Sequence, residues 1–401
     1  MLSHVNDWLN LLIRWIHVLT GIAWIGSSFF FMWLDSALEA PAKADLKADE
    51  SVTGTLFMVH GGGFFEVIKR KISFETMPKT LHWFKWEAYL TWISGILLLA
   101  VVYYMTGGMF LVDPAVSSIT PPQATVLGIS LLIVSWFAYD TLWEYSFKRD
   151  GGKNSGRLAT AICLVYIGGV TYGLCHLLSG RAAYIHVGAI LGTLMVGNVW
   201  VRIIPNQKRM VDAAKAGRTP DFSYGAFAKR RSVHNNYMTF PLIFIMISNH
   251  FPMMTGHLYN WLVLGGIILA SGGVRHVMNV KGVQWILAPS AVILIALFFM
   301  TAPPHEEMTA GGSPIAFAAA RNVIASRCIA CHSAHPTDRT FGGIAPNGVT
   351  FDDPARIKAL VERIKFRAVI SKTMPLANKT GMTEDERILL GRWIDQGAHL
   401  E

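Results

Sequence analysis

Long apolar runs alternate with short polar segments from the N-terminus to about residue 302. A bilayer core about 30 Å thick needs about 20 apolar residues in a helix, and eight runs reach or approach that length. These runs begin near Trp8, Glu87, Gln123, Leu158, Ala183, Tyr237, His257 and Val283, and the last one ends near Met300. The run from Tyr237 is the shortest and contains polar residues. The pattern predicts an all-α fold in which residues 1–302 form a polytopic bundle of eight transmembrane helices.

Composition supports a membrane location and removes one alternative. Hydrophobic residues make up 52% of the chain and charged residues 15%, whereas a soluble domain has about a quarter charged residues. The formal net charge of +9 could indicate a nucleic-acid-binding protein. The basic residues, however, cluster in short loops between apolar runs, where membrane topology explains them. We therefore expect the lipid bilayer as a partner and no nucleic acid.

The distribution of lysine and arginine predicts the orientation of the bundle. Loops after the first, third, fifth and seventh runs are basic, whereas the loops after the second, fourth and sixth runs hold only Arg181. Basic loops stay in the cytoplasm. The N-terminus and the C-terminal region are therefore expected on the periplasmic side of a bacterial inner membrane.

The character of the chain changes after Met300. Residues 303–312 read as a polar linker, and residues 313–401 as a small, soluble, helical domain. This domain contains Cys328-Ile329-Ala330-Cys331-His332. Two thiols at this spacing can bond both vinyl groups of a haem, while the next histidine binds its iron. The motif predicts a class I-like cytochrome c domain with a covalent haem c.

Two other uses of this motif fit the sequence less well. A zinc site needs further Cys or His ligands, and only His335 and His399 remain in this region. A redox Cys-x-x-Cys pair is typical of a thioredoxin-like strand pattern, which is absent here.

Met374 is the candidate for the sixth ligand of the haem iron. It precedes Pro375 in a polar loop well downstream of His332, and a thioether opposite a histidine raises the haem potential. The alternative is a loop methionine without a role. A helix beginning at Thr383, with Glu386 at capping-box spacing, is expected to pack its apolar face against the helix before Cys328.

The haem motif and the loop charges support each other. Haem c is attached on the outer side of the bacterial cytoplasmic membrane. The charge rule places the C-terminal region on that side independently.

Ionisable residues inside a bilayer are expensive and are candidates for function. Arg14 and His17 lie three residues apart on one helix face, His82 and Glu87 flank the start of the second run, and His234 precedes the sixth. Histidines on facing helices could also bind a non-covalent b-type haem as its axial pair.

The sequence resembles the bacterial membrane-bound urate oxidases. The resemblance rests on the segment from Arg14 to Ser28, on His60-Gly61-Gly62-Gly63, on the eight-span bundle and on the fusion to a cytochrome c domain. It implies an oxidoreductase of purine catabolism that oxidises urate to 5-hydroxyisourate. Electrons would pass to the haem, and then to a respiratory acceptor such as a soluble cytochrome c or a terminal oxidase.

The resemblance directs attention to groups that suit urate, which is a planar anion near neutral pH. An arginine offers bidentate contacts and aromatic side chains offer stacking surfaces. Candidates for these roles are Arg14, Arg275, Trp15, Trp24, Trp83 and Trp86. A histidine or carboxylate would take the proton and activate water, and the candidates are His17, His82, Glu87 and His234.

An alternative function is a membrane-anchored electron-transfer subunit, in which a passive or quinol-binding bundle delivers electrons to the cytochrome domain. A solute channel with an attached cytochrome is a weaker alternative, because transport does not require a haem.

Overall fold

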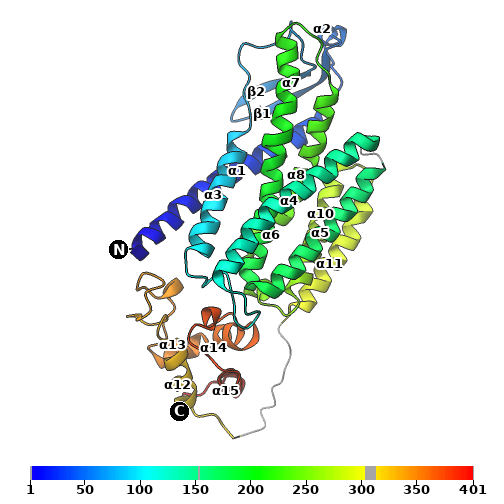
Figure 1. The fold of residues 1–401 in the computed structure, drawn as a ribbon. Coiled ribbons are helices and arrows are strands. Elements are labelled where there is room, and N and C mark those ends of the chain that lie inside the picture. Colours follow the sequence, from blue (N-terminus) through cyan, green and yellow to red (C-terminus); the bar gives the residue numbers. More distant parts are fainter. Residues whose placement is uncertain (1, 152–153, 303–312, 401) are drawn as a thin grey trace. The chain divides into compact units, whose positions relative to one another are not determined.

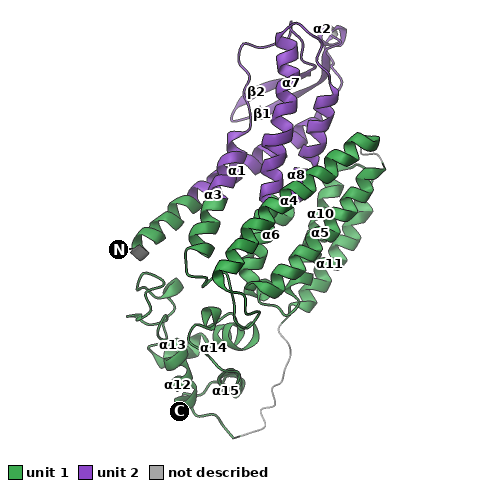
Figure 2. Cartoon of the chain, in the orientation of Figure 1, with its two compact units in different colours: residues 1–14, 96–191, 240–401 green, residues 15–95, 192–239 purple. Residues whose placement is uncertain are grey.

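The computed structural model describes residues 2–151, 154–302 and 313–400 (Figure 1). The predicted linker, residues 303–312, lies outside the described residues. The chain divides into two compact units, each built from separate stretches (Figure 2). Unit 1 consists of residues 1–14, 96–191 and 240–401, and unit 2 of residues 15–95 and 192–239.

A helix stands at each of the predicted apolar runs. These helices are α1 (Leu2–Ala37), α3 (Trp86–Leu99) with a π-helical extension (Ala100–Tyr104), α4 (Pro121–Asp150), α5 (Ser155–Leu177), α6 (Gly180–Gly197) continued through Asn198–Ile203 into α7 (Ile204–Lys215), α8 (Ser223–Ser248), α10 (Asn260–Asn279), and α11 (Leu287–Met300), which follows a short turn at Gln284–Ile286. In unit 1, α4 packs against α5, α5 against α10, and α10 against α11 (Figure 1).

Six helical stretches among the described residues are long and apolar enough to cross a membrane. They are His4–Ala37, Trp86–Tyr104, Pro121–Asp150, Ser155–Leu177, Gly180–Lys215 and Asn260–Asn279. The stretch Gln284–Met300 is apolar but shorter, and α8 is not in this set. The helices are compatible with a membrane bundle, and the count of eight spans stays a prediction.

Helix α8 begins earlier than the apolar pattern indicates. It starts at Ser223, whereas the apolar run starts near Tyr237. The first turns of the helix carry Lys229, Arg230 and Arg231. A search for apolar length does not detect a helix whose first half is polar.

The expectation of an all-α fold is wrong for one segment. Strands β1 (Val52–His60) and β2 (Gly63–Arg70) form an antiparallel hairpin. Gly61 and Gly62 make the two-residue turn with φ of 58° and 79°, the left-handed region that such tight hairpin turns require. The strands are rich in valine and phenylalanine, which favour β-structure. Two further short helices are α2 (Ala44–Ala48) and α9 (Pro252–Thr255).

The C-terminal region, residues 313–400, is helical. Its elements are α12 (Phe317–Arg327), α13 (Pro354–Ala359), α14 (Val361–Ile364), a π-helical segment (Lys365–Ile370), α15 (Glu384–Asp395), and 3₁₀ turns at Pro346–Gly348 and Leu376–Asn378. The predicted capping box is confirmed: the Thr383 hydroxyl accepts from the Glu386 backbone N–H, and the Glu386 carboxylate accepts from the Thr383 N–H.

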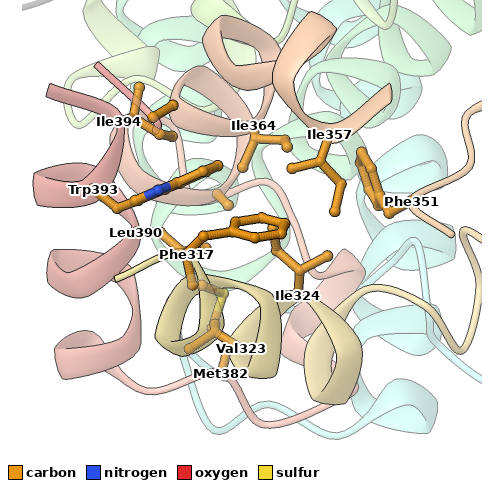
Figure 3. Packing of buried hydrophobic residues seen from close by; sticks show 13 residues of the cluster. Phe317, Val323, Ile324, Phe351, Ile357, Ile364, Met382, Leu390, Trp393 and Ile394 are labelled. Carbon is orange, nitrogen blue, oxygen red and sulfur yellow. The ribbon is translucent and has the colours of Figure 1, made fainter. Parts of the chain in front are cut away.

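Helices α12 and α15 share the core of this region (Figure 3). The rings of Phe317 and Trp393 have centroids 5.7 Å apart, and Leu390 and Trp393 are almost fully buried. The indole Nε1 of Trp393 donates to the His399 carbonyl at 3.0 Å. The predicted packing of the last helix on the helix before Cys328 is therefore confirmed.

Replacing Trp393 tests this core. Trp393→Ala should destabilise the C-terminal region by about 3–5 kcal/mol, because it leaves a large cavity. Trp393→Phe keeps most of the apolar contact and should cost about 1 kcal/mol for the lost hydrogen bond, plus a smaller packing term. Calorimetry of the full chain in detergent measures both. Equal effects of the two variants would contradict a core that depends on the volume of this side chain.

Candidate functional site

The four predicted haem-binding residues line one cavity in the C-terminal region. Cys328, Cys331, His332 and Met374 all contribute to its wall. The apolar part of the remaining lining includes Phe341, Val349, Phe351, Leu360, Ile364, Ala368, Pro375 and Leu376. Four basic side chains, Arg327, Arg363, Arg367 and Lys379, also contribute to the wall. Among the described residues, no group of three or more His, Cys, Asp or Glu side chains is placed to hold a metal ion.

The local backbone brings His332 and both cysteines to this cavity. Helix α12 ends at Arg327, and the backbone N–H groups of Cys331 and His332 both donate to the Cys328 carbonyl, at 3.2 and 2.9 Å. Burial raises the pKa of the Cys328 thiol to about 12. Burial and the nearby Asp338 carboxylate also raise the pKa of Cys331. Both thiols are therefore protonated at neutral pH.

The His332 ring is held in one tautomer. Its Nδ1 lies 3.0 Å from the Val349 carbonyl oxygen. A carbonyl only accepts, so Nδ1 carries the proton and donates it. Nε2 then keeps its lone pair, as in histidines that bind metals. Burial lowers the pKa of His332, with the Val349 bond acting in the opposite direction. A Phe351 ring 5.3 Å away supports the imidazole.

The Met374 loop is anchored by a residue that sequence reasoning missed. Arg387 on α15 is 5% exposed, and its Nη1 donates to the Met374 carbonyl at 2.8 Å and to the Ala368 carbonyl. The Met374 backbone N–H donates to the Arg367 carbonyl at 3.0 Å. A signal existed in the sequence, because Arg387 lies three residues before Leu390 and thus on the apolar face of the helix.

A larger cavity, about 490 Å³ in volume, lies within unit 2. Its size is typical of small-molecule sites. We call it the aromatic cavity, since its walls include Trp24, Phe31, Trp83 and Phe84. Its polar lining residues are Ser27, Ser28, Asp35, His82, Gln207, Lys229, Ser232, Asn235 and Thr239. They come from α1, from the segment before α3, and from α7 and α8 (Figure 2).

A buried amide network fixes one wall of the aromatic cavity. Asn235 Oδ1 accepts from Asn198 Nδ2 at 2.8 Å, and Asn235 Nδ2 donates to the Met195 carbonyl at 2.9 Å. Arg231 Nη1 donates to Asn198 Oδ1 at 3.4 Å. These bonds link α8 to the end of α6, and they determine which way the Asn235 amide faces.

The charged groups of the aromatic cavity are paired. Asp35 accepts from Lys229 at 2.7 Å and also forms an ion pair with Lys69. Asp35 and Lys229 are the two lining residues with a formal charge when His82 is neutral, so the lining carries no net charge. The His82 ring is exposed and packs edge-on against Phe84 at 4.8 Å.

One of the five residues predicted as catalytic lines the aromatic cavity. His82 lines the aromatic cavity, whereas Arg14, His17, Glu87 and His234 do not. Arg14 belongs to unit 1 and donates to the Asn10 side-chain oxygen at 2.8 Å. His17 joins α1 to α3, and its Nδ1 donates to the Thr91 carbonyl at 2.9 Å.

The remaining predicted residues lie in helices beside the cavity lining. Glu87 occupies the first turn of α3. His234 precedes Asn235 on α8. Of the tryptophans considered for stacking, Trp24 and Trp83 line the cavity, and Trp15 and Trp86 are exposed elsewhere. Gln207, Lys229 and Asn235 were not anticipated.

His186, a buried histidine in unit 1, bears on the expectation of a second haem. Its Nδ1 donates to the Ala182 carbonyl at 2.8 Å, and its Nε2 lies 2.9 Å from the Tyr104 hydroxyl. A Cβ on Gly128 would lie 2.6 Å from that Nε2. Both ring nitrogens are therefore engaged in a closely packed site. The b-type haem stays a prediction, and His186 does not offer it a free nitrogen in this arrangement.

Comparison with protein families gives one match. Residues 3–302 match the family described as urate oxidase N-terminal. Searches among curated proteins and among solved structures gave no match. The C-terminal region with Cys328, Cys331 and His332 lies outside the matched residues. Because the match covers most of the chain and includes the whole aromatic cavity, this chain belongs to the urate oxidase N-terminal family.

Proposed function

We propose that this protein oxidises urate and passes the electrons to a haem c bound by its own C-terminal region. The family match over residues 3–302 carries the proposal. The reaction adds water to urate and gives 5-hydroxyisourate, two protons and two electrons. The long apolar helices support an enzyme in a membrane. The loop charges favour an orientation with both termini on the periplasmic side of a bacterial inner membrane.

The C-terminal cavity suits a c-type haem. Two cysteines would hold it covalently, the free Nε2 lone pair of His332 would bind the iron, and the Met374 thioether would be the sixth ligand. When bound, such a group supplies a one-electron acceptor. The apolar part of the lining would pack against the ring, and the basic side chains of the wall would suit its carboxylates. Arg387 positions the Met374 loop by donating hydrogen bonds to the Met374 and Ala368 carbonyls.

The aromatic cavity is the proposed urate site. Trp24 and Trp83 offer faces for a planar purine, and Gln207, Ser232 and Asn235 offer donors and acceptors for its carbonyl and N–H edges. His82 is the lining residue suited to take a proton from the substrate or from the attacking water. Arg14 is not part of this proposal, because it is not among the residues that line the cavity.

The number of electrons released per urate determines what the downstream electron acceptor must do. Urate loses two electrons, whereas a single haem accepts one at a time. Each turnover therefore needs two transfers and a downstream acceptor, such as a soluble cytochrome c or a terminal oxidase.

An anaerobic optical titration with urate tests the proposal directly. Purified oxidised protein should show reduction of its haem c bands, with one urate consumed for every two haems. Bands that stay oxidised with urate but respond to a quinol would contradict the proposal and favour an electron-transfer anchor.

His82→Gln tests the proton-transfer role. We expect kcat to fall by about 10²–10⁴-fold, as for the loss of a general base, with the haem spectrum unchanged. His250→Gln is the matched control, because His250 lies outside the cavity lining. A His82→Gln enzyme with the wild-type pH profile and a kcat within a factor of two would remove His82 from the mechanism.

Met374→Ala tests the sixth ligand. The haem potential should drop, or the sixth site should open to added imidazole, since a thioether stabilises the reduced haem. Arg387→Lys should shift the same potential less, because the ligand remains but the guanidinium that donates to the Met374 and Ala368 carbonyls is lost. Redox titration and optical spectra measure both, with Met105→Ala as the control. Unchanged spectra and potential in Met374→Ala would refute the ligand assignment.

A further inference from the structure

Unit 2 holds a second cavity whose lining is basic. It has a volume of about 410 Å³ and is formed by two segments, residues 78–85 and residues 204–215. Four lysines line it, namely Lys79, Lys85, Lys208 and Lys215. Asp212 is the one carboxylate among the lining residues, so the formal charge of the lining is 4 − 1 = +3. We call this space the lysine cavity.

The four lysines are available to a ligand. Among the described residues, none of them forms an ion pair within 4.0 Å, whereas Lys69 and Lys229 both pair with Asp35. Lys85 is held over the indole faces of Trp86 and Trp200, with its Nζ 5.2 and 5.7 Å from the ring centroids. A cation–π contact fixes the ammonium group without neutralising it. The cavity therefore presents uncompensated positive charge.

The lysine cavity adjoins the aromatic cavity. Trp83 and Ile204 line both spaces. An anion bound by the lysines therefore lies in the space next to the proposed reaction site, and the two spaces share Trp83 and Ile204 as walls. A concave surface lined by one sign of charge raises the local concentration and association rate of oppositely charged ligands.

We infer that the lysine cavity is an entry site that binds the urate anion before it reaches the aromatic cavity. The inference rests on the proposed function. Lysine is a mobile, hydrated point charge, whereas arginine forms rigid bidentate contacts, so a ring of lysines suits brief capture rather than tight retention. Both lysine-bearing segments carry basic residues that follow an apolar run, and the charge rule favours the cytoplasm for them. Urate then enters from the cytoplasmic face.

Removing three of the charges tests the entry site. In Lys79→Gln/Lys208→Gln/Lys215→Gln, we expect the KM for urate to rise about tenfold, with kcat and the haem spectrum unchanged. The fall of kcat/KM with added salt should flatten as well. Lys85 stays in place, because it packs on two tryptophans. The matched control is Lys47→Gln/Lys71→Gln/Lys281→Gln, which removes the same charge from exposed sites outside the cavity.

Two kinetic outcomes in one lipid would overturn the inference, and a comparison between lipids adds a third. One is a triple variant with wild-type KM and salt dependence, and the other is an equal change in the control variant. Assays in nanodiscs of neutral and of anionic phospholipid separate the two sources of anionic ligand. A KM effect of the same size in both supports capture of urate, whereas an effect confined to anionic lipid would assign the lysines to lipid headgroups.

The failure of this inference is distinguishable from failure of the proposed function. Wild-type protein that does not reduce its haem with urate defeats the function. Calorimetric titration then tests anion binding at the lysine cavity independently of catalysis. Urate and inorganic phosphate are each titrated into the wild type and both triple variants. Anion binding that weakens about tenfold only in the cavity variant supports the site, and equal binding by all three proteins refutes it.

Discussion

The constraint on which the structure depends is the need of polar groups buried among long apolar helices to find partners within the protein. Helix α8 shows how unit 2 meets it. Its polar first half carries Arg231 and Asn235, which bond with Asn198 and the Met195 carbonyl on the neighbouring helical segment. Amides fixed in this way cannot turn to suit any solute. A cavity beside them therefore has a defined pattern of donors and acceptors, which is the property that recognition of a heteroaromatic ring requires.

The two kinds of chemistry proposed here are built by different physical means. In the C-terminal region, position comes from a short stretch of chain: one helical turn aligns Cys328, Cys331 and His332, and Val349 fixes the imidazole tautomer. In unit 2, the cavity is assembled from residues far apart in sequence, such as Trp24, His82 and Asn235. A small helical domain is enough to hold a compact motif in place. A distributed site needs the packing of several long helices.

This difference explains how much the sequence could reveal. The apolar runs predicted the helices, and Cys-x-x-Cys-His with Met374 predicted the residues that share the C-terminal cavity, because these signals are local. The hairpin of β1 and β2 escapes a search for long apolar runs, because its strands are only 9 and 8 residues long. Arg14 and His17 stood out by spacing on one helix, but spacing cannot show which helices enclose a space. Gln207 and Lys229 carry no local signal, and only tertiary structure brings them to the aromatic cavity.

The placement of charge in unit 2 agrees with the direction of the proposed reaction. Oxidation removes electrons from an anion, so the substrate becomes less negative as it reacts. A strong positive field at the reaction site would stabilise urate more than the transition state, and binding of that kind does not raise kcat. In the aromatic cavity Lys229 is paired with Asp35, whereas the lining of the adjoining lysine cavity has four lysines and one carboxylate. Attraction for the anion is thereby separated from the place where its charge is removed, and the reaction site is left to recognise shape and hydrogen bonds.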